Sequence, residues 1–201
     1  DEADVQSCIN VAVAGDTIRV PAGAATWATS VTWTNKAISV IGAGIDQTVI
    51  TLNNNTAFIV IMNAGGTNSW RISGFTFTGA HNMTFNITSG SVNVPTKGWR
   101  IDHIRLNSPG ANAGWLFFIH GITWGLMDHL VIDGNPSPIA AIYGYLDTAD
   151  ESTTCSPHCM GFMYWNRDLN LGSEEAIYIE DSLIKFNGTA DVPIQDLMYG
   201  G

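Results

Sequence analysis

Basic residues are scarce in this sequence. Lysine and arginine total 8 against 18 aspartates and glutamates, which gives a formal net charge of −10 at neutral pH. Nucleic-acid binding needs a concentrated basic patch, and the chain has no run of Lys and Arg that could form one. The charge also disfavours anionic membrane surfaces. It disfavours a strongly anionic polysaccharide unless calcium or a local basic cluster bridges the two.

Long apolar runs and abundant cysteine are also missing. No stretch reaches the roughly 18 apolar residues that a membrane-spanning helix needs, so we expect no membrane insertion. Three cysteines do not by number indicate a redox compartment. Cys155 and Cys159 lie close enough in a polar segment to form a small disulfide, with free thiols as the alternative. Cys8 would then be buried or paired outside the chain.

Charged residues of both signs make up only 13% of the chain, whereas hydrophobic residues make up 45%. That apolar fraction is enough for a continuous core and excludes a disordered chain. A helical protein normally covers its surface with Lys and Glu. Here uncharged Gly, Thr, Asn and Ser must form much of the surface, as on exposed sheet faces. The composition therefore favours an all-β fold.

An internal repeat is the most informative feature of the sequence. Four segments align without gaps, and their first residues are separated by 29, 26 and 52 residues. A period in this range, carried by short strand patterns, is typical of a stacked β-solenoid. The segments are WRISGFTFTG from Trp70, WRIDHIRLNS from Trp99, GLMDHLVIDG from Gly125 and IYIEDSLIKF from Ile177.

Each repeat has an apolar position followed by a two-residue bend. Gly, Asp and His suit a tight bend with one residue near the left-handed region. After the bend, apolar residues alternate with exposed positions, as in a strand that buries one face. Each repeat therefore predicts strand, bend, strand and a longer loop. The bends are Ser73-Gly74, Asp102-His103, Asp128-His129 and Glu180-Asp181.

The segments between the repeats supply a third strand for each coil. Dividing the 201 residues by the shorter period gives about seven coils. Apolar residues at helical spacing near the start predict a short helix that covers the open end of the stack. These residues are Val5, Cys8, Ile9, Ala12 and Val13.

A series of motifs follows this helix. It comprises the turn Gly15-Asp16-Thr17, the strand Ile18-Arg19-Val20, the turn Pro21-Ala22-Gly23 and the strand end Ile41-Gly42-Ala43-Gly44. The series resembles the N-terminal cap and first coils of the pectin-lyase-like superfamily. The resemblance implies a right-handed, single-stranded parallel β-helix. It implies no single activity, because the superfamily includes polysaccharide lyases, glycoside hydrolases, esterases, phage tailspikes and adhesins.

We therefore expect one β-helix domain over residues 1–201, with the cap at 1–15 and coils over 16–201. The final residues suggest neither a capping helix nor a closing polar strand. By analogy with related β-helices, we expect further coils in the natural protein.

Asp102, Asp128 and Glu180 share one repeat position, beside His103 and His129. Equivalent positions in adjacent coils lie about 4.8 Å apart, so such carboxylates could hold Ca²⁺ or form an acid/base pair. We favour a simpler interpretation, in which the side chains shape the bends by bonding to nearby backbone N–H groups. The 52-residue interval implies an intervening coil, so we expect Asp128 and Glu180 not to touch.

Outward positions after the bends carry polar residues that could contact a substrate. Lyases of the superfamily abstract a proton next to a uronate with Arg or Lys, while calcium neutralises the carboxylate. The arginine motifs of pectate lyases are absent, so an ordinary solvated strand face is the alternative. The candidates are Arg105, Asn107, Asp133 and Lys185.

Aromatic residues in loop-like segments offer platforms on which sugar rings could stack. Trp70 and Trp99 share a repeat position and are better explained by core packing. Four Asn-X-Ser/Thr triplets would permit glycosylation in a secretory host. The loop aromatics are Trp115, Trp124, Tyr164 and Trp165, and the triplets begin at Asn54, Asn82, Asn86 and Asn187.

Two functional hypotheses follow. The leading one is a carbohydrate-interacting protein, extracellular or on a cell or virion surface, whose partner is a polysaccharide or surface glycan. A lyase or glycoside hydrolase activity is left open, and calcium is the one cofactor considered. The alternative is a non-catalytic structural or adhesive solenoid, such as a phage or cell-surface fibre or a matrix component, that self-associates through its ends or faces.

Overall fold

The computed structural model describes residues 1–53, 58–62, 69–79, 84–89, 96–108, 115–120, 123–134, 140–145, 177–186 and 192–197. Within these ranges the chain forms mostly strands, with one short helix at the N-terminus. The elements are α1 (Glu2–Val11), β1 (Thr17–Arg19), β2 (Gly23–Trp27), β3 (Val31–Thr34), β4 (Ser39–Ile41), β5 (Thr48–Leu52), β6 (Phe58–Met62), β7 (Arg71–Thr78), β8 (Phe85–Ser89), β9 (Thr96–Ser108), β10 (Trp115–His120), β11 (Thr123–Asp128), β12 (Val131–Gly134), β13 (Ala140–Tyr145), β14 (Ile177–Glu180), β15 (Leu183–Phe186) and β16 (Val192–Leu197).

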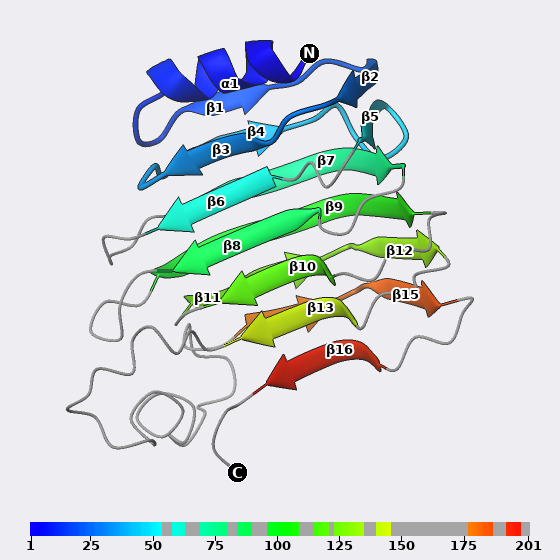
Figure 1. Ribbon diagram of the computed structural model, residues 1–201. Helices are drawn as coiled ribbons and strands as arrows, with labels where there is room; N and C mark the ends of the chain where they lie inside the picture. Colours follow the sequence, from blue (N-terminus) through cyan, green and yellow to red (C-terminus); the bar gives the residue numbers. More distant parts are fainter. Residues whose placement is uncertain are drawn as a thin grey trace, which may run out of the picture.

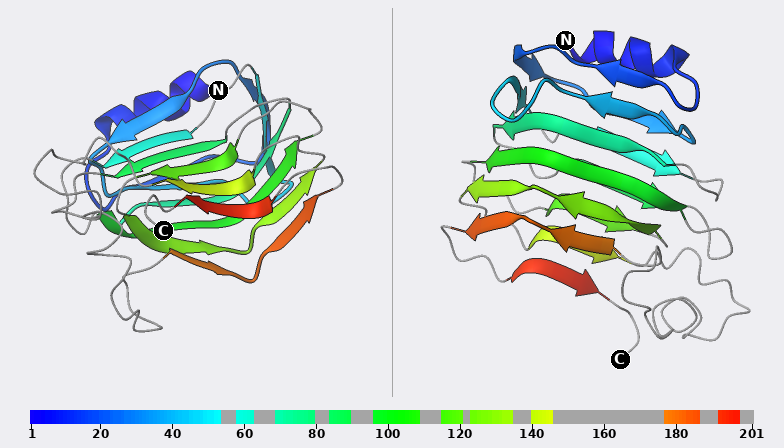
Figure 2. Two further views of the ribbon diagram at one scale, coloured as in Figure 1. Left: turned by 60° about the horizontal axis from the view of Figure 1, so that its bottom comes forward. Right: turned by 180° about the vertical axis from the view of Figure 1, so that it is seen from behind.

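The strands form two parallel sheets. Sheet A has ten strands, and its main path runs β1-β4-β7-β9-β11-β14; sheet B has six, in the order β3-β6-β8-β10-β13-β16. Figure 1 shows the strands of the two sheets stacked from α1 downward, and Figure 2 shows the same stack from two other sides. Each path has six rungs among the described residues, where the sequence period predicts about seven coils. The prediction that the chain is mainly β-structure, with a short N-terminal helix, is confirmed.

The four repeat segments lie on neighbouring strands of sheet A. Ile72 is in register with Ile101, Ile101 with Met127, and Met127 with Ile179. The expectation of a coil between Asp128 and Glu180 is wrong, because β11 pairs directly with β14 and these two residues are partners. No further strand of sheet A therefore lies between β11 and β14, although the interval between their repeat segments is twice the shorter period.

The core consists of columns of like side chains, because parallel strands in register place the same repeat position above itself. The rings of Phe58, Phe85 and Phe117 stack on three rungs of sheet B, with centroids 5.8 Å and 4.8 Å apart. Trp70 and Trp99 are buried and stack with centroids 5.3 Å apart, which confirms core packing for this pair.

The bends also follow the sequence prediction. The second residue of each bend has a positive φ angle: 80° at Gly74, 51° at His103, 52° at His129 and 44° at Asp181. Gly tolerates this region freely, and His and Asp adopt it more readily than most residues. The four bends thus place two histidines directly above one another on the outside of sheet A.

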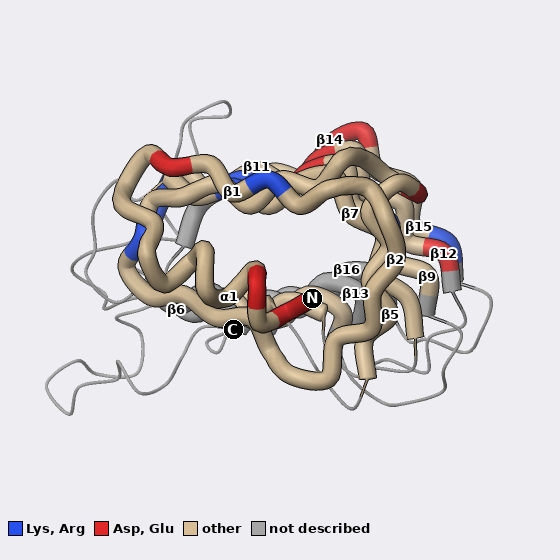
Figure 3. The backbone as a smooth tube through the Cα atoms, turned by 90° about the horizontal axis from the view of Figure 1, so that it is seen from above, with Lys and Arg blue, Asp and Glu red and all other residues tan. Residues whose placement is uncertain are grey.

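The helix α1 lies across the first end of the stack (Figure 3). The Asp1 side chain accepts hydrogen bonds from the backbone N–H groups of Ala3 and Asp4 and so caps the helix. Val5 and Ile9 face the core, as predicted. Val13 lies beyond the helix and is exposed, and Cys8 is an exposed free thiol rather than a buried one.

Side-chain hydrogen bonds join this helix to the rest of the stack, and those of Gln6 and Lys36 are the shortest. The Gln6 side-chain amide donates to the carbonyl oxygen of Thr32 and accepts from its N–H, each at 2.8 Å, so it pairs with the outer edge of β3. The ammonium of Lys36 donates to the carbonyl oxygens of Ile9, Asn10 and Ala12 at the helix C-terminus. In the described ranges, no helix has the length and apolar character needed to cross a membrane.

Candidate functional site

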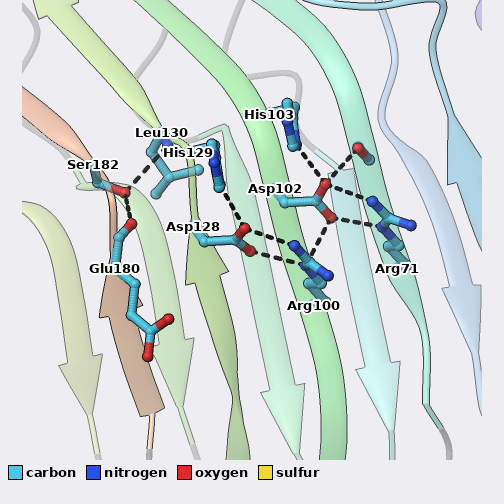
Figure 4. A network of polar contacts seen from close by, with 10 residues as sticks. Arg71, Arg100, Asp102, His103, Asp128, His129, Leu130, Glu180 and Ser182 are labelled. Carbon is cyan, nitrogen blue, oxygen red and sulfur yellow. Dashed lines mark hydrogen bonds and ion pairs between the residues drawn. The ribbon is translucent and has the colours of Figure 1, made fainter.

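Polar side chains converge on the outer face of sheet A, across β7, β9 and β11, next to the bends (Figure 4). In a strand, residues two apart share a face. The first residue of each bend and the residue two positions before it therefore point outward together. The apolar residue between these two is buried. We call this cluster the Arg–Asp–His network; it consists of Arg71, Ser73, Arg100, Asp102, His103, Asp128 and His129.

Asp102 is the centre of the network. The Arg71 guanidinium donates from Nε to Oδ1 at 2.6 Å and from Nη2 to Oδ2 at 2.7 Å. The Ser73 hydroxyl donates to Oδ2 at 2.8 Å, and Nδ1 of His103 lies 2.8 Å from the same oxygen. These neighbours cover the carboxylate so fully that its side chain has no exposed surface.

The next rung repeats the arrangement around Asp128. Arg100 donates from Nε to Oδ1 at 2.9 Å and from Nη2 to Oδ2 at 2.7 Å. Nδ1 of His129 lies 2.7 Å from Oδ2. The Nε of Arg100 is also 3.3 Å from Oδ1 of Asp102, so this arginine connects the two carboxylates.

Both carboxylates are held in the ionised form. Burial alone would raise the pKa of Asp102, but hydrogen bonds, of which the bond from Arg71 contributes most, lower it to about 2. Burial opposes the shift at Asp128 as well, and bonds from Arg100 and His129 lower its pKa. The same carboxylates raise the pKa of each arginine, chiefly by accepting its hydrogen bonds. Neither aspartate can therefore act as a proton donor near neutral pH.

The two histidines present their other edge to solvent. An ionised carboxylate only accepts hydrogen bonds, so Nδ1 of each imidazole carries the proton. In the neutral ring Nε2 is then an acceptor. The rings of His103 and His129 stack with centroids 4.6 Å apart and planes 4° from parallel, and each side chain is about half exposed. The result is two identical acceptor edges on adjacent rungs.

The network does not fit calcium. A calcium ion needs several oxygen ligands, whereas each oxygen of Asp102 already accepts a hydrogen bond from Arg71, and Arg100 lies between the two carboxylates. Nearly parallel imidazoles direct their Nε2 lone pairs side by side, so they do not converge on one ion. Among the described residues, no group of three or more His, Cys, Asp or Glu is arranged to hold a metal.

The bend interpretation of Asp102 and Asp128 needs correction. We expected their side chains to bond to nearby backbone N–H groups, but both bind arginine and histidine side chains. The histidines, and not the aspartates, carry the positive φ angle. Glu180 occupies the same column on β14, and its neighbour at the preceding outward position is Leu126 and not an arginine. The ion pairs therefore stop one rung earlier.

Three of the four polar residues predicted to bind substrate lie next to one another, and the fourth does not join them. Asn107, Asp133 and Lys185 are register partners on β9, β12 and β15 and form one outward column. Arg105 lies two residues before this column, and its guanidinium binds Asp46 at 2.5 Å. That contact pairs the arginine with a carboxylate of the protein's own surface.

Most of the other predicted positions cannot be placed. Trp115 lies at the start of β10 and Trp124 in β11, but their side chains are outside the described part. Asn86 is the second residue of β8, which lies between β6 and β10, and is half-buried. Tyr164, Trp165, Cys155, Cys159, Asn54, Asn82 and Asn187 are outside the described residues.

Sequence reasoning missed Arg71, Arg100 and Ser73 as members of the site. The signal was the repeated Trp-Arg-Ile triplet, which places an arginine two positions before the acidic slot. In parallel strands one period apart, that arginine reaches the aspartate of the following rung. The pairing becomes visible only once the repeats are aligned in register.

Comparison of the chain with protein-family models, with curated proteins and with solved structures finds no match. The arrangement of the Arg–Asp–His network is therefore the basis for the functional proposal.

Proposed function

We propose that this chain is an extracellular, right-handed parallel β-helix that binds a polysaccharide or surface glycan on the outer face of sheet A. The observation that carries the proposal is the Arg–Asp–His network, with arginine and histidine edges exposed on adjacent rungs.

The β-helix assignment is supported by the order in which the chain enters the sheets. From β3 onward it alternates between sheet B and sheet A, and each return adds one parallel rung below the previous one. Parallel strands need a crossover connection, and passing through the opposite sheet provides it. The cap α1 over the first rung agrees with the resemblance of the N-terminal motifs to pectin-lyase-like proteins.

The exposed groups suit sugar hydroxyls. A guanidinium has five N–H donors, and a bidentate carboxylate uses two of them. The side chains of Arg71 and Arg100 are 42% and 39% exposed, so the remaining donors can reach a ligand. Beside them, the Nε2 acceptors of His103 and His129 can receive hydroxyl protons. Rigid donors next to rigid acceptors match a ligand whose hydroxyls both donate and accept.

An enzymatic role requires specific catalytic groups in addition to a surface that binds the glycan. A glycoside hydrolase needs one carboxylic acid with a raised pKa, and Asp102 and Asp128 have lowered ones. A lyase needs a base and a cation near the uronate carboxylate, and a neutral imidazole beside a guanidinium supplies both residue types. Among catalytic versions of the proposal, a lyase is therefore the one that the network favours.

The test is a panel of uronate-containing and neutral polysaccharides, with binding measured by affinity electrophoresis and calorimetry. Arg100→Gln should weaken binding by about tenfold, since it removes a charged fork of donors. Arg19→Gln, which removes an exposed cation of β1 outside the network and outside the predicted substrate-binding residues, should bind like the parent. Absorbance of unsaturated uronates and assays of reducing ends detect lyase and hydrolase products.

Circular dichroism of Arg100→Gln establishes that it is folded, and His129→Asn serves as a second variant if it is not. An absence of binding across the panel, or equal binding by all variants, would count against the proposal.

A structural or adhesive solenoid is the second candidate. It is favoured because both carboxylates of the network bind arginines of the same sheet. These ion pairs join neighbouring rungs and so stabilise the stack itself. In that case sedimentation should show fibres or a closed oligomer, and no glycan should bind.

A further inference from the structure

We propose that the outer edge of β2, at the first end of the stack, binds an extended basic peptide of a partner protein, which adds a strand to sheet A. This edge is separate from the outer face that carries the Arg–Asp–His network. Peptide binding here requires neither the network nor a glycan, so the two proposals are tested independently.

The outer edge of β2 has backbone groups without a hydrogen-bond partner. In the described part of the chain, β2 pairs only with β5. The N–H of Gly23 and the carbonyl oxygen of Trp27 bond to the residues that flank β5. Successive residues of a strand direct their backbone groups to opposite sides, so those of Ala24 and Thr26 point away from the sheet. Both residues are exposed, and such an edge is a template for another extended chain.

The helix α1 protects the edge of sheet B but leaves the edge of β2 open. The side-chain amide of Gln6 occupies the outer edge of β3 with a donor and an acceptor. Near β2, the Glu2 carboxylate accepts from the N–H of Ala28, which lies one residue beyond the strand. Edge strands that resist pairing usually carry charged residues or proline, and β2 contains neither.

A cavity of about 310 Å³ opens beside this edge, between α1, β1 and β2. Figure 3 looks down on this end of the stack, with α1 along one side and β1 and β2 along the other. The buried side chains of Val5, Trp27 and Ile50 form part of its wall. Pockets for small molecules usually have about 300–1,000 Å³, so this volume suits a few side chains. A strand added to β2 directs alternate side chains toward the core, and therefore into the cavity.

The charge around the cavity favours a basic partner. Asp1 and Asp4 line it on one side, and α1 contains no lysine or arginine. Asp4 pairs with the terminal ammonium, and Arg19 lies on the β1 side, but the net charge of −10 still attracts cations. A lysine of the added strand can lay its stem along the apolar wall and place its ammonium beside the carboxylates. A second copy of this acidic chain would instead bring like charges together.

The test uses the acetylated and amidated peptide Thr-Val-Thr-Lys-Thr-Val-Thr, in which Val and Lys share one face of the strand. Calorimetry should give a dissociation constant below about 1 mM. Hydrogen exchange of the Ala24 and Thr26 amides should slow at least about tenfold in the bound state, because these groups gain acceptors. The amide of Ala25, which faces β5, should change less. Replacing the peptide's Lys by Glu should weaken binding about tenfold.

Two N-methylated forms of the peptide test the backbone pairing on the parent protein. Methyl groups on the Thr nitrogens block one edge of the added strand, and methyl groups on the Val and Lys nitrogens block the other. Only one edge can face β2. One form should therefore bind like the unmodified peptide, and the other should not bind.

The deciding variant is Thr26→Pro, which removes an outward N–H without removing a bond to β5. Proline is tolerated on an edge strand, and the preceding Ala25 already has the extended backbone that proline requires. The variant should bind the peptide at least about tenfold more weakly, whereas Thr26→Val, which keeps the N–H, should bind like the parent. Circular dichroism establishes that Thr26→Pro is folded, and the methylated peptides test the same pairing if it is not.

No binding of the unmodified peptide up to about 1 mM would overturn the inference. Equal binding of the two methylated forms, unchanged exchange at Ala24 and Thr26, or undiminished binding by folded Thr26→Pro would overturn it as well. A dimer in sedimentation that Thr26→Pro dissociates would show that a second copy occupies the edge, against a basic partner. None of these outcomes affects the glycan proposal, which Arg100→Gln tests.

Discussion

Asp102 lies on the outer face of a sheet, yet its side chain has no exposed surface. A buried charge is costly unless it is paired and hydrogen-bonded, and this one has a bidentate arginine, a hydroxyl and an imidazole. The lowered pKa shows that these partners more than offset the cost of burial. The same carboxylate also fixes the ring of His103, so the stability of the fold and the geometry of the site depend on one group.

Asp102→Asn should lower the free energy of unfolding by about 2 kcal/mol at neutral pH, from the shift between the usual pKa and about 2. Because the folded pKa is lowered, this stability is present above about pH 4 and is lost as the pH falls to about 2. Urea unfolding of parent and variant across this range should converge at the acid end.

Asp133→Asn is the matched control, since Asp133 lies in an outward column outside the network. A loss of about 1 kcal/mol or less for Asp102→Asn would instead support a role limited to the bend. So would a difference from the parent that does not change with pH.

The bends could be predicted from the sequence because they depend on local residues. The network could not, because it depends on contacts between residues far apart in the chain. Gly74, His103 and His129 adopt a backbone conformation that their own chemistry favours, so local sequence is informative. The bond between Arg71 and Asp102 joins residues 31 positions apart. It depends on the register of two strands, which no local pattern determines.

At the scale of elements, α1 is joined to the stack by few groups. The helix has no basic residue in its last turn, and Lys36 supplies the missing cation from the segment between β3 and β4. Carbonyl oxygens at a helix C-terminus lack partners within the helix and carry partial negative charge. Lys36 therefore both satisfies them and holds the helix on the first rung.

Lys36→Met should lower the free energy of unfolding by about 1 to 2 kcal/mol, because three carbonyl oxygens lose a charged donor while most of the apolar stem is kept. Hydrogen exchange of the amides in α1 should accelerate more than that of β9. Lys185→Met is the control and should change neither quantity. Uniform acceleration across the chain would show that the cap does not open separately.

The connections between elements were harder to predict than the elements themselves. The four repeat segments and the short helix were predicted because their apolar periodicity is strong. The interval before Ile177 was assigned an extra coil because its length is twice the period. Length alone does not show whether an interval adds a rung, and the direct pairing of β11 with β14 shows that no rung of sheet A lies between them.

The whole molecule is a stack in which each rung contacts mainly its neighbours. The rings of Phe58, Phe85 and Phe117 run through three rungs of sheet B and couple them. Stability in such an array depends on the interfaces between repeats, and cooperativity weakens where an interface is damaged.

Phe85→Ala should lower the free energy of unfolding by about 3 to 5 kcal/mol, because it leaves a cavity in the middle of this column. It should also separate the urea transitions followed by tryptophan fluorescence and by circular dichroism, which should coincide in the parent. Ile87→Val, at another buried position of β8, should cost about 1 kcal/mol and keep the transitions together. Coincident transitions in Phe85→Ala would show that the rungs are coupled by other contacts.

The contact between Gln6 and β3 has a consequence for growth of the stack. A side-chain amide carries the same donor and acceptor as a peptide unit, so Gln6 occupies the place that a strand of another molecule would take at Thr32. A parallel stack is otherwise a template that any chain of similar spacing could extend. Gln6 therefore blocks the pairing of a strand from a second molecule at Thr32, on the outer edge of sheet B.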